Sequence, residues 1–308
     1  MITVVEKNVL SSDGVHILRG KVYLPEGDAK GLFHVVHGMT EHIGRYDAFM
    51  RKIAEEGFIC FAYDQLGHGN TAKNESELGY IADKDGWKLL ISDVAVFSES
   101  VKKEYGENLP YYLLGHSMGS FIVRSAAELS VKPDKLIVLG TGGPNLAAVG
   151  GIPMFSAIKL FRGGKSYSDL AEKMAFGTYN NRFSDENDQR SWLTKNEEIR
   201  RIFDADKFCN YRFTISALRD LLHLLVFCNR KQWFENLNKS LPVLLLSGKD
   251  DPVGDYGKGV LTVYKSLKNA GANVKIKLYE NCRHEILNDT CKEEAIDDIV
   301  DFICEKEE

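Results

Sequence analysis

The chain has 308 residues, of which 44% are hydrophobic, and its formal net charge is -5. This length suits one large α/β domain with room for an inserted subdomain, and the mixed, slightly acidic charge argues against binding to nucleic acid. No stretch approaches the ~18 apolar residues of a membrane span, and the N-terminus has no signal-like apolar core. We therefore expect no signal peptide and no stable membrane anchor.

The cysteines show no CxxC pair and no metal-ligand spacing: Cys60, Cys209, Cys228, Cys282, Cys291 and Cys304. In a chain of this size such a pattern favours six free thiols in a reducing compartment. The prediction is therefore a cytoplasmic protein without a metal site.

The order of apolar segments predicts the fold class. Two strand-like runs flank SSDG at 11–14, and Asp-Gly between such runs predicts a β-hairpin. The next runs are rich in β-branched and aromatic residues, as is typical of strands buried on both faces; they lie at 32–38, 58–64, 110–115, 135–140, 242–248 and 274–279. Segments of helical period separate them, so we expect an α/β fold with a mostly parallel central sheet and helices on both faces.

The alternation stops between residues 144 and 241, where no convincing strand occurs. We expect a core made of 1–143 and 242–308, and a helical cap insertion, or lid, at 144–241. In open α/β sheets ligands bind outside the carboxyl ends of the strands. An insertion that leaves the strand at 135–140 would lie over that site. The alternative is an extra helical layer with no role in binding.

Ser117 lies in GHSMG, between an apolar strand-like run and a helix-forming stretch. G-x-S-x-G in this context is typical of a nucleophile elbow, in which glycines allow a tight, strained turn. The N-terminus of the following helix favours negative charge nearby. The sequence therefore indicates a serine nucleophile, with an incidental serine in a tight turn as the alternative.

A serine nucleophile needs a base, and the base needs an orienting acid; in this fold they follow the serine in the order acid, then histidine. Only His223 and His284 follow Ser117. His223 lies on an apolar stretch of the cap, so His284, just past a strand end, is the predicted base. Asp250 and Asp251 both follow the strand at 242–248, and Asp255 lies further along the same loop; we favour Asp251 and leave Asp250 and Asp255 open.

The tetrahedral intermediate also needs hydrogen-bond donors for its oxyanion. We expect the backbone N–H of Met118, which follows the nucleophile, and that of Met39, which follows the strand at 32–38. This chemistry needs no cofactor.

Five motifs extend the interpretation to a family. HGMTEHIGRYD, YDQLGHG, GHSMG, SGKDDPVGD and YENCRHEILND occur in the order and spacing of the monoacylglycerol lipase and lysophospholipase-like serine hydrolases. The chain resembles this family over nearly its whole length, and its cap resembles the bacterial type. The resemblance implies an α/β-hydrolase fold with Ser117 as nucleophile, Asp251 as acid, His284 as base, and Met39 and Met118 as oxyanion donors.

The resemblance also implies substrate-binding residues. In monoacylglycerol lipases the matching side chains line the pocket of the leaving alcohol; here these are Glu41, Arg45 and His116. The alternative is an ion pair between Glu41 and Arg45 that fixes the loop. Two departures stand out: Gln65-Leu66 replaces the commoner HRGHG type of sequence, and Met39 replaces a smaller residue, which could narrow the acyl entrance.

The predicted function is hydrolysis of single-chain lipid esters, monoacylglycerols or lysophospholipids, through an acyl-enzyme. The acyl chain would lie under an apolar cap lined by Leu221, Leu224 and Leu225, with transient contact between the protein and lipid surfaces. The alternatives are a general short-chain carboxylesterase, a prolyl-aminopeptidase-type peptidase that uses acidic cap segments such as SDEND, and a non-enzymatic binding module.

Overall fold

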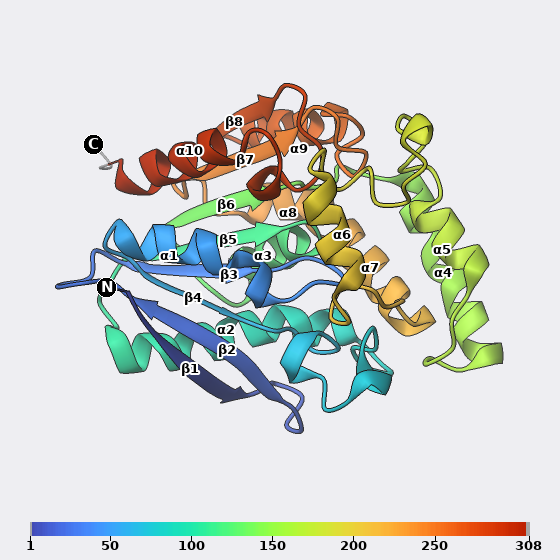
Figure 1. Cartoon of the computed structure of the whole chain (residues 1–308), viewed down its shortest axis with the longest axis horizontal. Coiled ribbons are helices and arrows are strands. Elements are labelled where there is room, and N and C mark those ends of the chain that lie inside the picture. The colour runs from blue at the N-terminus through green and yellow to red at the C-terminus, as the bar shows by residue number, and fades with distance from the viewer. Residues whose placement is uncertain (1, 306–308) are drawn as a thin grey trace.

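An eight-stranded sheet runs through the computed structural model, which describes residues 2–305 (Figure 1). The strands are β1 (Thr3–Leu10), β2 (Ile17–Leu24), β3 (Leu32–Val36), β4 (Ile59–Tyr63), β5 (Tyr111–His116), β6 (Lys135–Leu139), β7 (Val243–Gly248) and β8 (Val274–Tyr279), in the spatial order β1-β2-β4-β3-β5-β6-β7-β8. The predicted hairpin and all six later strands are confirmed. Residue 1 and residues 306–308, the ends of the predicted core, lie outside the described range.

Most of the sheet is parallel, as predicted. β1 pairs with β2 and β2 with β4 in antiparallel fashion, and every other neighbouring pair is parallel. Each residue of β3 through β7 is buried. Because side chains alternate along a strand, Leu32 and Val36 enter one hydrophobic cluster while Phe33 and Val35 enter the other.

Helices cover both faces of the sheet (Figure 1). The cluster on one face includes side chains of α1 (Asp47–Glu55) and α10 (Lys292–Cys304); the other includes side chains of α2 (Gly86–Tyr105), α3 (Met118–Leu129) and α9 (Lys258–Asn269). Short 3-10 helices, η1 (Ile43–Tyr46), η2 (Gly69–Thr71), η3 (Glu75–Glu77) and η5 (Ile286–Asn288), lie in loops. Together these elements form the α/β-hydrolase fold.

The chain between β6 and β7 contains helices and no strand. In order these are α4 (Leu146–Arg162), α5 (Asp169–Phe176), η4 (Ser184–Glu186), α6 (Glu197–Ala205), α7 (Ile215–Cys228) and α8 (Lys231–Asn236). α7 packs on α2 and α3 as well as on α4, whereas α4 and α5 extend to one side of the molecule (Figure 1). Within residues 2–305, no helix combines the length and apolar character needed to cross a bilayer.

Candidate active site

Ser117 lies in a strained turn between β5 and α3. Its backbone has φ 56° and ψ -121°, a region that residues other than glycine seldom occupy. A Cβ atom on Gly115 would clash with the carbonyl oxygen of Gly119, and one on Gly119 would clash with that of Val36. Glycine on both sides therefore allows β5, α3 and β3 to approach closely while Ser117 faces the pocket.

The structure brings His284 and Asp251 together. Nδ1 of His284 lies 3.0 Å from each carboxylate oxygen of Asp251. Asp251 is fully buried, and its carboxylate also accepts hydrogen bonds from Val253 N–H at 2.8 Å and the Ser247 hydroxyl at 3.2 Å. This arrangement places the proton on Nδ1 and leaves Nε2 of His284 able to accept one.

The two alternatives to these residues lie elsewhere. The carboxylate of Asp250 makes no hydrogen bond to His284; its backbone N–H donates to Cys282 O at 2.9 Å. The His223 ring stacks on Trp87, with 5.7 Å between ring centroids. Both residues are therefore outside the arrangement around His284.

The loop that carries His284 is held by the cap. Glu285 N–H donates to Leu193 O at 2.8 Å, and the Trp192 ring lies 5.1 Å from the His284 ring. These cap residues are about 90 positions earlier in the chain, and no local sequence pattern points to them. Trp192 covers the imidazole and limits the access of water to it.

The prediction of six free thiols is wrong for one pair. Cys282 and Cys291 form a disulfide, with their Cα atoms 6.4 Å apart, while Cys60, Cys209, Cys228 and Cys304 are free. The loop between β8 and α10 folds back on itself and brings its two ends within bonding range. The spacing of the cysteines in the sequence does not indicate that this loop folds back. The expectation of a reducing compartment assumed six free thiols, and only four are free.

The loop after β3 packs against the nucleophile. A Cβ atom on Gly38 would lie 3.0 Å from Cβ of Ser117. The next residue, Met39, lines the same pocket as Ser117 and Met118. Met118 begins α3, where an amide has no acceptor within its own helix, and Met39 N–H makes no backbone hydrogen bond within residues 2–305.

A buried charged network lies beside this loop. Glu41 accepts hydrogen bonds from Arg45 and from the Tyr46 hydroxyl, each at 2.8 Å. Arg45 also makes a bidentate pair with Glu285, at 2.7 and 2.6 Å. Nδ1 of His116 lies 2.9 Å from the Tyr46 hydroxyl and 3.3 Å from Glu41. The alternative ion pair between Glu41 and Arg45 therefore exists.

Only part of this network borders the pocket. Glu41, His116 and Glu285 line it, whereas Arg45 stands behind them. The sequence interpretation missed Tyr46 and Glu285. Their one available signal was proximity in the chain, since Tyr46 follows Arg45 and Glu285 follows the predicted base.

The charges of the network compensate one another. Burial raises the pKa of Glu41, but the hydrogen bond with His116 and the charge of Arg45 outweigh it and hold that pKa well below its usual value. Burial likewise raises the pKa of Glu285, and the Arg45 charge lowers it further than burial raises it. Burial lowers the pKa of His116, but Glu41 raises it above normal. Two carboxylates and one guanidinium thus stay ionised out of water.

The pocket has a volume of about 940 Å³ and lies between the sheet edge and the cap. Its core side carries Ser117, His284 and the polar groups described above. Its cap side is largely apolar and includes Ala148, Gly151, Phe155, Leu221, Leu222 and Leu225. The predicted lining residues Leu221 and Leu225 are therefore at the pocket.

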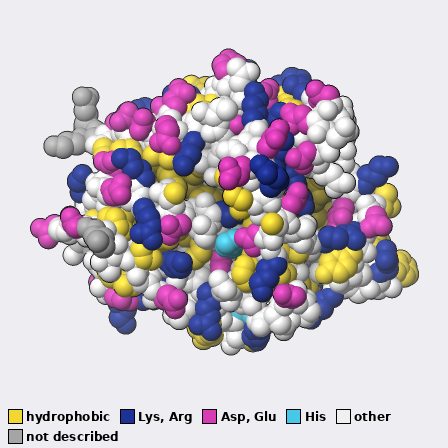
Figure 2. Space-filling view, in the orientation of Figure 1, with side chains coloured by type: hydrophobic (Ala, Val, Ile, Leu, Met, Phe, Trp, Pro, Cys, Tyr) yellow, Lys and Arg dark blue, Asp and Glu magenta, His cyan; other side chains and the backbone are white. Residues whose placement is uncertain are grey.

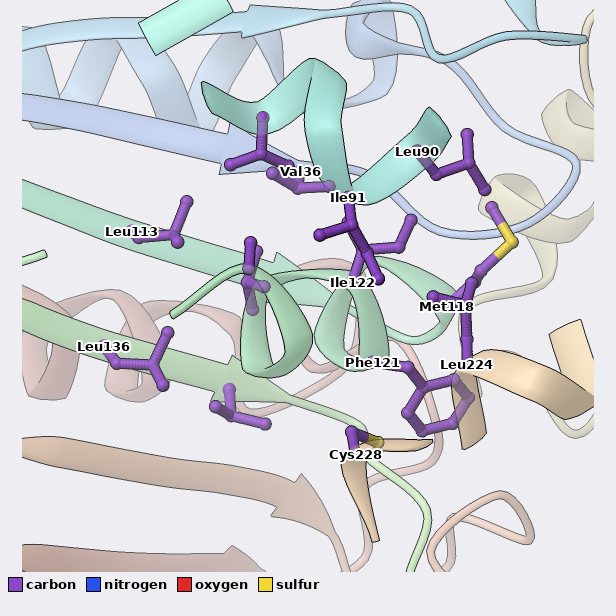
Figure 3. Close-up of a cluster of buried hydrophobic side chains, with 14 of the residues drawn as sticks. Val36, Leu90, Ile91, Leu113, Met118, Phe121, Ile122, Leu136, Leu224 and Cys228 are labelled. Atoms are coloured by element: carbon purple, nitrogen blue, oxygen red, sulfur yellow. The ribbon is translucent and has the colours of Figure 1, made fainter. Parts of the chain in front are cut away.

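Leu224 is not at the pocket, contrary to the prediction. It is fully buried with Met118, Phe121 and Cys228 in the core cluster (Figure 3). At about 100° per residue, Leu224 lies roughly 60° from Leu221 on the side away from Leu225. That side of α7 packs on α3, so the leucine fills the core.

One cluster in the described chain has the side chains of a metal site. His42, Asp206 and Cys209 offer ligand atoms within 4.8 Å of one another. However, Nδ1 of His42 accepts a hydrogen bond from Gly44 N–H, so Nε2 carries the proton and donates to Asp206 at 2.9 Å. The arrangement is a hydrogen bond between the loop after β3 and the cap.

Comparison with known proteins identifies the family of the chain. A family model described as serine aminopeptidase S33 (Hydrolase_4) matches residues 27–291. Mouse monoglyceride lipase is 25% identical over 282 residues, which cover 90% of this chain and 82% of that protein. Monoacylglycerol lipase of Mycolicibacterium smegmatis is 23% identical over 92% of this chain and 91% of its own length.

A shorter match and a solved structure complete the comparison. Rat monoglyceride lipase is 34% identical over 122 residues, which span 39% of this chain and 38% of that protein. A thermostable carboxyl esterase from Bacillus coagulans, solved in complex with glycerol, superposes with a TM-score of 0.90 at 30% identity, with 98% of both chains covered. A lipase in an open form also superposes with a TM-score of 0.90, at 24% identity and 98% coverage of both chains.

Proposed function

Because this chain belongs to the serine aminopeptidase S33 family of α/β-hydrolases and is a serine hydrolase, we propose that it cleaves esters of single-chain lipids, monoacylglycerols or lysophospholipids. One observation carries the proposal. Ser117 shares a pocket of about 940 Å³ with His284, whose Nδ1 is held by Asp251.

The proposed reaction has two halves. Oγ of Ser117 attacks the acyl carbonyl carbon while Nε2 of His284 takes the hydroxyl proton, and the N–H groups of Met39 and Met118 bind the oxyanion. The intermediate expels the alcohol, which receives that proton, and leaves an acyl-Ser117 ester. Water then attacks this ester with His284 again as base, which releases the fatty acid and restores the serine.

The two sides of the pocket support a lipid ester as substrate. The apolar cap side, with Phe155, Leu221 and Leu225, suits an acyl chain because burial of each methylene contributes about 0.8 kcal/mol. Glu41 and His116 border the opposite side and suit the hydroxyl groups of a leaving alcohol. The names of the mouse and mycobacterial relatives agree with this substrate class.

The outer face of the cap supports transient contact with a lipid surface. Leu146, Leu160 and Phe161 are 90, 80 and 85% exposed, and Figure 2 shows hydrophobic side chains among Lys and Arg at this end of the molecule. Met174 is both exposed and part of the pocket lining. An apolar surface that reaches the pocket would let a substrate enter from a lipid layer.

The test of the reaction is an ester panel. Glycerol, phosphocholine and nitrophenyl esters of increasing acyl length are assayed with wild type, Ser117→Ala and the exposed control Ser240→Ala. We expect activity that increases with acyl length, is lost in Ser117→Ala and is unchanged in the control. Turnover by Ser117→Ala would contradict the mechanism, and a preference for acetyl or butyryl esters would indicate a short-chain carboxylesterase.

The test of the surface contact is sedimentation with anionic phospholipid vesicles. Leu160→Ser/Phe161→Ser is compared with Leu129→Ser, which changes an exposed leucine of α3. We expect the cap variant to sediment less with vesicles and to hydrolyse a soluble nitrophenyl ester normally. Equal sedimentation of both variants would contradict the contact.

The family description makes an aminopeptidase the second candidate. A free α-amino group would need unpaired carboxylates in the pocket. Glu41 and Glu285 share Arg45, Glu172 pairs with Arg212, and the SDEND segment at 184–188 does not line the pocket. Among the pocket carboxylates of residues 2–305, only the exposed Asp255 has no ion pair. This favours esters. Proline anilides assayed in the same panel decide the matter, because cleavage of anilides in preference to lipid esters would establish a peptidase.

The cytoplasmic location stays a prediction. It draws on the four free cysteines, and the disulfide does not support it.

A further inference from the structure

Gln65 is a buried side chain next to the loop that carries Met39. It follows β4 and is 1% exposed. Its Nε2 donates a hydrogen bond to His37 O at 2.6 Å, and its backbone N–H donates to Nε2 of His37 at 3.0 Å. Gln65 therefore holds both the main chain and the side chain of the residue two positions before Met39.

These contacts also determine the tautomer and the protonation state of the His37 ring. Because Nε2 of His37 accepts a hydrogen bond, the ring proton is on Nδ1, which donates to Gly38 O at 2.8 Å. Burial lowers the pKa of His37, and this keeps the ring neutral and able to accept. The hydrogen bonds thus continue from Gln65 through His37 to the residue that precedes Met39.

The loop needs this support. Asp64, the neighbour of Gln65, accepts a hydrogen bond from Ile43 N–H at 2.9 Å, so two successive residues hold the two ends of the segment 37–43. Within it, Thr40 has φ 51°, a left-handed conformation that residues other than glycine seldom adopt. Such a conformation persists only where surrounding contacts maintain it.

We propose that Gln65 is a positioning residue that holds the Met39 N–H where the oxyanion of the tetrahedral intermediate forms. The inference rests on the proposed function. Gly38 lies against Ser117, so a shift of His37 is transmitted over two residues to a donor whose place relative to the nucleophile matters. The effect should fall on the transition state, because the oxyanion forms only there.

The test uses Gln65→Met, which keeps the length of the side chain and removes its polar groups. A soluble nitrophenyl ester is the substrate, and active sites are counted by titration with a fluorophosphonate. We expect kcat per active site to fall about ten- to a hundredfold with KM within about twofold. Affinity for a trifluoromethyl ketone, which forms a tetrahedral adduct, should fall by the same factor as kcat.

Two variants separate positioning from stability. Gln65→His retains an N–H donor and should recover most of kcat. Ser98→Ala removes a buried side-chain hydrogen bond to a backbone carbonyl in α2, and should lower the melting temperature while leaving kcat unchanged. Gln65→Leu, which also has no side-chain donor, provides the same comparison if Gln65→Met does not fold.

The outcomes are distinct. An unchanged kcat in Gln65→Met or Gln65→Leu, or a loss that titration traces wholly to fewer active sites, would overturn the role of Gln65 alone. An equal loss of kcat in Gln65→His would also overturn it. Wild-type protein without esterase activity would overturn the proposed function itself.

Discussion

The two walls of the pocket are built in opposite ways. On the core wall the polar groups are held by several partners each: Glu41 has four, and Asp251 has three. The cap wall consists mainly of apolar side chains on α4 and α7, and its outer face exposes leucines and a phenylalanine to solvent. The core wall suits catalysis, because reacting groups must be positioned to within about 0.5 Å. The cap wall suits binding of an acyl chain, because that binding depends on the apolar surface area that is buried.

Buried acids show the same contrast. Glu41 and Glu285 share Arg45, and their pKa values are lowered. Asp220 on α7 is 2% exposed, and its Oδ1 has no hydrogen-bond partner within residues 2–305. Burial raises the pKa of Asp220 to about 7, although the backbone N–H of Trp87 partly opposes this shift. A buried acid is therefore stably charged on the core wall and not in α7.

The largest expected effect is on the core wall, at Asp251. Asp251→Asn keeps the shape of the side chain but allows the wrong tautomer of His284, so kcat should fall by about 10⁴-fold. Asp250→Asn is the matched control and should stay within about twofold. Steady-state kinetics on a nitrophenyl ester measure both, and similar losses in the two variants would contradict the assignment of the acid.

Next in size is removal of the shared cation. Arg45→Met leaves two buried carboxylates uncompensated and should lower the free energy of unfolding by about 3–5 kcal/mol at pH 7. The lowered pKa values of Glu41 and Glu285 contribute stability that is present at neutral pH and is lost as pH falls through them. This contribution is fully present above the ordinary carboxyl pKa of 4.5, so the loss in the variant should be smaller at pH 3 than at pH 7.

Urea unfolding measures this difference. The control is Arg51→Met, since Arg51 makes its ion pair with Asp47 at the surface, where its side chain is 45% exposed. That change should cost less than about 1 kcal/mol. Equal losses in the two variants would show that the buried network is no more important than a surface pair.

A smaller effect is expected from Asp220→Asn. The unfolded carboxyl titrates near 3.8 and the folded one near 7, so between these values the folded protein holds a proton that the unfolded chain has released. Stability therefore falls as pH rises from about 4 to 7. The free energy of unfolding of wild type should fall by roughly 1–3 kcal/mol between pH 5 and pH 8 from this group alone. Asp220→Asn should lack this fall.

Unfolding in urea at the two pH values is the measurement, with Asp185→Asn at an exposed position of the cap as control. Wild type and Asp185→Asn should show the same pH dependence. If Asp220→Asn shows it too, the proton is not on Asp220.

The smallest effect concerns the width of the cap wall. A Cβ atom on Gly151 would lie 2.8 Å from Cδ1 of Leu222 and would push that side chain toward the pocket. Gly151→Ala should reduce kcat/KM for lauroyl esters relative to butyryl esters by several-fold, about 1 kcal/mol. Gly150→Ala gains the same methyl group in open space and should leave the ratio unchanged.

Both substitutions replace a glycine inside α4, so each gains about 0.5–1 kcal/mol from helix propensity. In Gly151→Ala the displacement of Leu222 reduces this gain, and the ratio of two esters on the same protein is independent of the folded fraction. A shift of the ratio in Gly150→Ala, or its absence in Gly151→Ala, would mean that the acyl chain does not lie between α4 and α7.

Much of the fold was predictable because its signals are local. Apolar runs separated by helical periods predicted the six later strands and the parallel sheet, although the edge strand β8 is only partly buried. GHSMG predicted the strained turn at Ser117, since a Cβ atom on Gly115 would clash with the carbonyl oxygen of Gly119 within the same turn. The order of motifs also predicted that Asp251 and His284 would follow strand ends, at one edge of the sheet.

The tertiary structure decided what depends on distant segments. Arg45 meets Glu285 across 240 positions, Trp192 covers His284, and Cys282 meets Cys291 where a loop returns. Leu224 could not be assigned to core or pocket from the sequence, because α7 carries leucines both on the side that faces α3 and on the side that faces the pocket. Local periodicity predicts which residues are buried, whereas only the tertiary packing determines which residues they contact.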